Sequence, residues 1–127
     1  MAKRIIYTSK APNPVGPYNQ GVEINGTLYV SGQIPINPET SEVIHGSVQE
    51  ETELAMNNLL EIIKEAGYSI EDVVKTTMFV KDLSNFALVN SIYASFFNEA
   101  TAPARECVEV ARLPKDVQVE ISCIAIK

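Results

Sequence analysis

The residues best suited to chemistry are concentrated in residues 103–127, where a guanidinium, a thiol and a carboxylate follow one another. Arg105, Cys107 and Glu120 belong to two stretches in which aliphatic residues recur at every second position, the period of a β-strand. An arginine can hold a carboxylate through two parallel hydrogen bonds, and a glutamate can take up or deliver a proton. These residue types are suited to anion binding and proton transfer.

The alternation predicts that residues 103–127 form two antiparallel strands joined by a turn at Leu113-Pro114. This pairing places Arg105 and Cys107 on one polar face with Glu120, and makes Arg105 and Glu120 diagonal neighbours. A one-residue bulge would change the pairing. A polar face of this kind is normally a solvated surface, so the pattern alone leaves both a site and a plain surface open.

Local signals predict the elements that must position these residues. Asn25-Gly26 between two apolar runs is typical of a β-hairpin. Ser47 and Glu50 fit a capping box that starts a helix, and Gly67 fits its end. The predicted order is a strand, a hairpin, a helix, a strand, a helix that Asp82 caps, and the final hairpin. We therefore expect an α+β protein, with a mixed sheet of about six strands and two helices on one face.

Length and composition limit the function classes. The 127 residues predict a single domain, 1–127. A net charge of −6 with scattered basic residues argues against a nucleic-acid binder. No apolar stretch approaches the roughly 20 residues of a membrane span, and the N-terminus lacks the apolar core of a signal peptide. We therefore expect a cytoplasmic protein without a membrane partner, whose two cysteines are reduced thiols.

Several familiar kinds of site are missing from the sequence. It has no Gly-rich dinucleotide or phosphate loop and no metal-ligand cluster. His45 is the single histidine and lies in a predicted loop, so one chain cannot assemble a Ser-His-Asp triad or a His-based zinc site. An enzyme built from this chain is expected to use no cofactor and no metal.

Four stretches of the chain, in order, resemble the reactive-intermediate deaminase family, RidA, also called the YjgF family. They read GPYNQG, VSGQIP, VKTTMFVKDL and PARECVEVARLPKD. The resemblance implies a chorismate-mutase-like fold and a homotrimer with active sites in clefts between subunits. It also implies hydrolysis of 2-imino acids, such as 2-iminopropanoate and 2-iminobutanoate, to 2-keto acids and ammonia. This activity would remove reactive enamines and imines released by enzymes that use pyridoxal phosphate.

The family's site residues match positions spread over most of this sequence. Carried over by that resemblance, the catalytic residues are Arg105, Glu120 and Cys107, and the substrate-binding residues are Tyr18, Ser31, Asn90 and Arg105. Arg105 would hold the substrate carboxylate, Glu120 would handle water and protons, and Cys107 would play a supporting role. Tyr18 would close the cleft and Ser31 would add a hydrogen bond. On pattern alone, Tyr18 is more simply a packing lid over the core.

Two other functions stay open at this stage. A small-carboxylate-binding regulatory protein would use the same cleft without turnover, and a third possibility is an endoribonuclease that inhibits translation. The sequence departs from the family pattern at Asn19, where serine is common, and in a short connection from Phe97 to Pro103. Both departures are expected beside the cleft, where they would alter substrate range and leave the chemistry unchanged.

Overall fold

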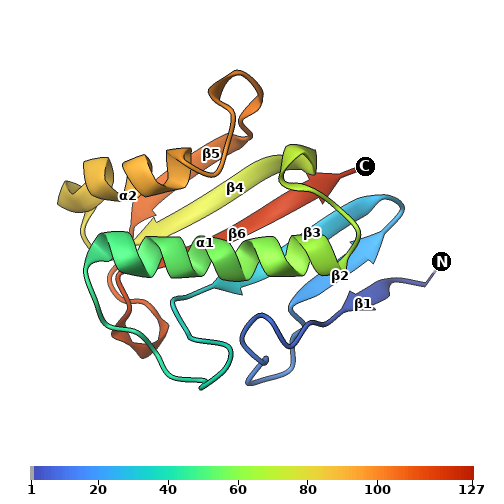
Figure 1. Cartoon of the computed structure of the whole chain (residues 1–127), viewed down its shortest axis with the longest axis horizontal. Helices are drawn as coiled ribbons and strands as arrows, with labels where there is room; N and C mark the ends of the chain where they lie inside the picture. The colour runs from blue at the N-terminus through green and yellow to red at the C-terminus, as the bar shows by residue number, and fades with distance from the viewer. Residues whose placement is uncertain (1) are drawn as a thin grey trace.

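The computed structural model describes residues 2–127, which form a six-stranded mixed sheet with both helices on one face (Figure 1). The strand order is β1-β2-β3-β6-β4-β5; β4 and β5 run parallel, and the other neighbours run antiparallel. The predicted α+β architecture is confirmed. The elements are β1 (Arg4–Ile6), β2 (Gly21–Ile24), β3 (Thr27–Gln33), α1 (Val48–Glu65), β4 (Val73–Val80), α2 (Phe86–Ala94), β5 (Ala104–Glu109) and β6 (Val119–Ile126).

The elements with strong local signals form where the sequence predicts them. Ser47 caps α1, and its hydroxyl and the Glu50 carboxylate each accept a backbone N–H of the other residue. Gly67 follows the helix with φ of 85°, a conformation that costs glycine little. Asn25 and Gly26 both have positive φ and join β2 to β3, as a type I′ hairpin requires.

The predicted hairpin of β5 and β6 is wrong. β5 pairs with β4 in parallel and β6 pairs with β4 on the other side, so β4 lies between them (Figure 1). The connection 110–118 passes the end of β4, where Val110 N–H donates to Val80 O and Lys81 N–H donates to Gln118 O. Period-two alternation identifies a strand, but it carries no information about which strand is its partner.

The wrong partner also put Arg105 on the wrong face. Arg105 lies in register with Thr76 and Cys123, both buried beneath the helices. Glu120 alternates with the fully buried Val119 and Ile121, so it points to the opposite face. The two residues are therefore not diagonal neighbours within one chain.

The face without helices carries a row of apolar side chains. Ile5, Val22, Tyr29 and Ile124 lie in register across β1, β2, β3 and β6. Ile5 and Tyr29 are 47% and 49% exposed. The helix-covered face, by contrast, forms the core, in which side chains such as Leu59 of α1 are fully buried. An exposed contiguous row of apolar side chains is unusual on the surface of a monomer.

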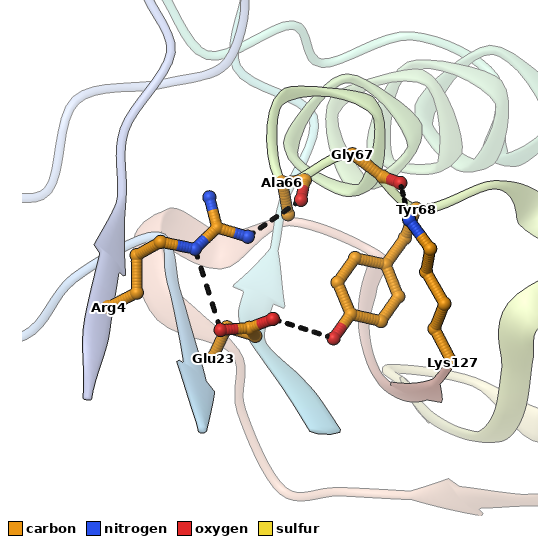
Figure 2. A network of polar contacts seen from close by, with 6 residues as sticks. All are labelled: Arg4, Glu23, Ala66, Gly67, Tyr68 and Lys127. Atoms are coloured by element: carbon orange, nitrogen blue, oxygen red, sulfur yellow. Dashed lines mark hydrogen bonds and ion pairs between the residues drawn. The ribbon is translucent and has the colours of Figure 1, made fainter. Parts of the chain in front are cut away.

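A polar network ties the end of α1 to both ends of the chain (Figure 2). Arg4 donates to the Ala66 carbonyl at 2.8 Å and Lys127 Nζ to the Gly67 carbonyl at 2.8 Å. The two cations thereby satisfy carbonyls left free at a helix C-terminus and oppose its negative dipole end. Glu23 links Arg4 to the Tyr68 hydroxyl, and these two hydrogen bonds hold the pKa of Glu23 below its usual value.

Candidate functional site

Three of the predicted site residues line one cavity of about 540 Å³. It lies between the end of β3 and the start of β6, and loops 12–20, 34–41 and 114–115 contribute to its wall. Tyr18, Ser31 and Glu120 all face it. A cavity of this size is typical of small-molecule sites, which combine an apolar wall with a few polar groups. Its apolar wall includes Pro12, Val15, Ile34, Ile36 and Pro114.

Glu120 is the acidic group of this cavity. Its side chain is half-buried, and burial raises the pKa of its carboxyl above the usual value. A Cβ added to Gly32 would collide with the Glu120 carboxylate. Gly32 thus leaves the space that Glu120 occupies, at a point where the β3–β6 register shifts between Val30 and Gln33. A carboxyl with a raised pKa is suited to exchanging protons with a substrate.

Tyr18 and Ser31 add polar groups to the same cavity, beside Glu120. Tyr18 is 48% exposed and lines the cavity, so its interpretation as a packing lid over the core is wrong. Its hydroxyl accepts the Val15 N–H at 3.4 Å. The Ser31 hydroxyl donates to the Asn19 carbonyl at 2.6 Å, so that its oxygen keeps lone pairs free for a ligand.

Gln20 is a residue of this region that the sequence analysis missed. It is fully buried, and its amide oxygen accepts the Thr8 N–H at 2.7 Å. Its amide nitrogen donates to the carbonyls of Thr8, Ala11 and Pro12. These bonds fix the loop that carries Tyr18. Gln20 belongs to the same GPYNQG stretch as Tyr18, and a glutamine within a Pro- and Gly-rich loop was the available signal.

Arg105 and Asn90 form a second group on the helix side of the sheet. Arg105 Nη1 donates to Asn90 Oδ1 at 2.7 Å, and its guanidinium carbon lies 4.9 Å from the centre of the Tyr93 ring and 5.4 Å from that of Phe86. These contacts orient the guanidinium. No carboxylate of residues 2–127 lies within 4.0 Å of it, so its remaining donors are free to bind an anion. Both residues line a second hollow of about 650 Å³.

Cys107 lies next to Arg105 on the same face of β5, in register with Met78. Its side chain is half-buried, and burial raises the pKa of its thiol, although the nearby Arg105 charge opposes this shift. The thiol is therefore protonated at neutral pH and is a weak nucleophile.

The predicted residues thus fall into two groups within one chain. Tyr18, Ser31 and Glu120 line the first cavity, while Asn90 and Arg105 line the second with Cys107 beside them. His45 is an exposed loop residue, as expected. Across residues 2–127 there is no cluster of three or more metal-ligating side chains. None of the helices in that range combines the length and apolar character that crossing a membrane requires.

Comparison with known proteins gives matches over almost the whole chain. The family model described as Endoribonuclease L-PSP matches residues 8–127. A RutC family protein of Synechocystis is 53% identical over 99% of this chain and 98% of its own length. An Escherichia coli protein provisionally named reactive intermediate deaminase TdcF is 47% identical, over 98% of each. The chain belongs to the RidA/YjgF family. The family predicted from the four sequence motifs is therefore confirmed.

A solved structure of the RidA/YjgF family has the same fold. The crystal structure of E. coli TdcF with bound serine superposes with a TM-score of 0.91, at 45% identity and with 98% of each chain covered. At this level of similarity the overall fold is shared with TdcF. The role of each residue in this chain follows from its own contacts and position.

Proposed function

We propose that this protein hydrolyses small 2-imino acids, such as 2-iminopropanoate and 2-iminobutanoate, to 2-keto acids and ammonia. The observation that carries the proposal is the pair of complementary half-sites. One half-site offers an oriented guanidinium that has no carboxylate partner among residues 2–127, and the other offers a half-buried carboxyl with a raised pKa. Together they match the two parts of a 2-imino acid: an anionic carboxylate and a C=N bond that water must attack.

The reaction needs binding, water activation and proton transfer. Arg105 binds the substrate carboxylate with two parallel hydrogen bonds, while Asn90 holds the guanidinium in place. The Glu120 carboxylate takes a proton from the water that attacks the protonated imine, forming a tetrahedral carbon that bears hydroxyl and amine groups. It then gives this proton to the amine nitrogen, and it takes up the hydroxyl proton as the C–N bond breaks, ammonia leaves and the keto group forms. Positioning and electrostatics suffice, because imines also hydrolyse without a catalyst.

We further propose that the two half-sites meet between subunits of a homotrimer. Within one chain Arg105 and Glu120 point to opposite faces of the sheet, so a complete site requires a second copy. The uncovered sheet face offers the surface for association, because its row of apolar side chains includes the half-exposed Ile5 and Tyr29. Cyclic assembly would then create one site at each interface.

TdcF with bound serine lends support from a relative, since serine carries the same α-carboxylate as a 2-imino acid. The name of the family model points instead to RNA cleavage. The net charge of −6 weighs against that reaction, because an RNA backbone requires a basic surface. A binding protein without turnover would need the arginine alone, whereas the Glu120 carboxyl favours catalysis.

A coupled assay tests the proposal directly. Threonine dehydratase generates 2-iminobutanoate from threonine, and the release of 2-ketobutanoate is followed with and without this protein. Acceleration that scales with protein concentration supports the deaminase. Unchanged release, with a keto acid still binding to the protein, would favour the carboxylate-binding alternative.

A further inference from the structure

Glu51, in the first turn of α1, is a buried acid that the proposed reaction does not use. It is 1% exposed, and within residues 2–127 no lysine or arginine lies within 4.0 Å of it. Both of its carboxylate oxygens are engaged by one residue. Oε1 accepts the Gln118 backbone N–H at 2.8 Å, and Oε2 accepts the Gln118 side-chain amide at 2.7 Å. We call these two bonds the Glu51–Gln118 clamp.

A buried acid without a cation is a costly way to join a helix to a strand. Apolar residues of similar volume often stabilise a fold as well or better, whereas buried polar groups can fix one specific geometry. The clamp engages the backbone as well as the side chain of Gln118, so it fixes the position of the main chain itself. This arrangement suggests that the position of Gln118 matters for more than packing.

Gln118 lies between a strained turn and Glu120. Lys115 and Asp116 before it have φ of 57° and 56°, a region that non-glycine residues rarely adopt. Lys115 lines the same cavity as Glu120. Besides the clamp, the Gln118 carbonyl accepts the Lys81 N–H at 3.0 Å. These hydrogen bonds therefore fix the main chain at Gln118, just before β6 begins and two residues before Glu120.

The neighbouring strand cannot fix Glu120 in the same way. The register between β3 and β6 shifts between Val30 and Gln33, which pair with Cys123 and Ile121. Glu120 lies beside this irregular segment, where the regular ladder is interrupted. Its main-chain position is therefore set by β4, on which Phe79 is its partner, and by the clamp just before it.

We propose that Glu51 is a positioning residue for the proposed deaminase reaction, acting through Gln118 to hold Glu120 against the substrate. This inference rests on the role proposed above for Glu120. Glu51 itself is buried and does not line the cavity that contains Glu120. Through Gln118, Glu51 ties the main chain that carries Glu120 to the start of α1. A small displacement of a catalytic carboxyl lowers the reaction rate by a large factor.

The test first replaces Glu51 by glutamine and then exchanges the residue types of Glu51 and Gln118. In Glu51→Gln, one amide N–H₂ faces that of Gln118, which is held in its orientation by a second hydrogen bond from Gln118 Nε2 to the Gly46 carbonyl at 3.2 Å. One of the two clamp bonds is therefore lost. We expect kcat to fall by roughly tenfold or more, with KM changed by less than about twofold. The double variant Glu51→Gln/Gln118→Glu restores an acceptor opposite the new amide, loses only the Gln118 bond to the Gly46 carbonyl, and should recover a large part of kcat. Glu53→Gln, at an exposed position of the same helix, is the matched control and should behave as wild type.

Amide hydrogen exchange at Glu120 and Ile121 reports on the clamp independently of activity. We expect faster exchange at both positions in Glu51→Gln and normal exchange in the double variant. A wild-type kcat in Glu51→Gln, even with lowered thermal stability, would show a purely structural role and overturn the inference. If the wild-type protein has no deaminase activity, the proposed function fails, and unchanged exchange would then also reject the clamp as a positioning device.

Discussion

Arg105 and Glu120 lie on opposite faces of the sheet, on strands that flank β4 on its two sides. Arg105 is in register with Thr76 of β4, whereas Glu120 is in register with Phe79. Their side chains therefore leave the sheet on opposite sides within one chain. The separation therefore excludes a direct Arg105–Glu120 ion pair within a chain, and it explains why the proposed site needs a second subunit.

Arg105→Ala should reduce kcat/KM by at least about a hundredfold, because the substrate offers no other strong handle than its carboxylate. Each charge-assisted hydrogen bond contributes roughly 1.5–3 kcal/mol, and each 1.36 kcal/mol is about a factor of ten. Arg105→Lys should recover only part of the loss, since a point charge cannot reproduce two parallel hydrogen bonds. Steady-state kinetics with 2-iminobutanoate measures both effects.

Stability and assembly are the controls for Arg105. Its side chain is exposed and makes no ion pair within residues 2–127, so the fold and the oligomeric state should not change. Lys64→Ala, which removes an exposed positive charge from the end of α1, should leave activity unchanged. Wild-type turnover in a trimeric Arg105→Ala protein would remove this residue from the site.

Glu120→Gln should lose at least about a hundredfold in kcat and yet be the more stable protein at about pH 7. Burial raises the pKa of Glu120, so the folded chain holds this proton more tightly than the unfolded chain does. The stability that the proton provides is present below the unfolded pKa and is lost as pH rises through the folded pKa. The melting-temperature difference between variant and wild type should therefore shrink towards about pH 4. A constant difference would contradict the raised pKa.

Local chemistry explains why much of the fold was predictable. The capping box of Ser47 and Glu50 and the Asn25-Gly26 turn act over a few residues, so the sequence around them is sufficient. The partner of β5 depends instead on β4, about thirty residues earlier in the chain, and on the path of the connection 110–118. No local pattern specifies that pairing, and the predicted hairpin failed for this reason.

The same limit applies to the site. Of the residues that the resemblance to RidA proteins selected, all except Cys107 line the two cavities, but the resemblance could not show that they lie in two groups. Gln20 and Glu51 were missed because their importance comes from burial and hydrogen-bond partners in distant segments. A buried glutamine or glutamate looks the same in a sequence as an exposed one.

Gly32→Ala should lower kcat strongly while preserving the fold, because its added Cβ would displace the Glu120 carboxylate. Gly67→Ala provides the contrast. Gly67 has φ of 85°, and a Cβ at this position would meet only open space, so alanine there should cost about 1 kcal/mol of stability without affecting kcat. Kinetics and thermal melting of both variants separate the two effects. Equal kcat values for the two variants would mean that Gly32 does not make room for a functional Glu120.

Cys107→Ser should retain activity within about threefold, because a thiol that is protonated at neutral pH is a weak nucleophile. Burial raises the pKa of Cys107 more than the Arg105 charge lowers it. Mass spectrometry of the protein during turnover should show no adduct at this residue. An inactive but folded and trimeric Cys107→Ser protein, or a trapped adduct, would require a different mechanism.

Subunit mixing tests the shared site most directly. Arg105→Ala and Glu120→Gln proteins are each expected to be inactive, because every site lacks one essential group. If the variants are unfolded together in equal amounts and refolded, some interfaces will combine an intact Arg105 of one subunit with an intact Glu120 of the next. Random assembly makes this combination at about a quarter of the interfaces, so about a quarter of wild-type activity should return.

Each variant refolded alone is the control for the mixture. Refolding each variant alone, at the same total concentration, should restore no activity, and light scattering should show the same assembled mass in every sample. A site contained in one chain predicts no recovery in the mixture, because each chain would still lack one group. Recovery near a quarter of wild-type activity would therefore establish that Arg105 and Glu120 act across a subunit interface, whereas its absence from properly assembled trimers would reject the shared site.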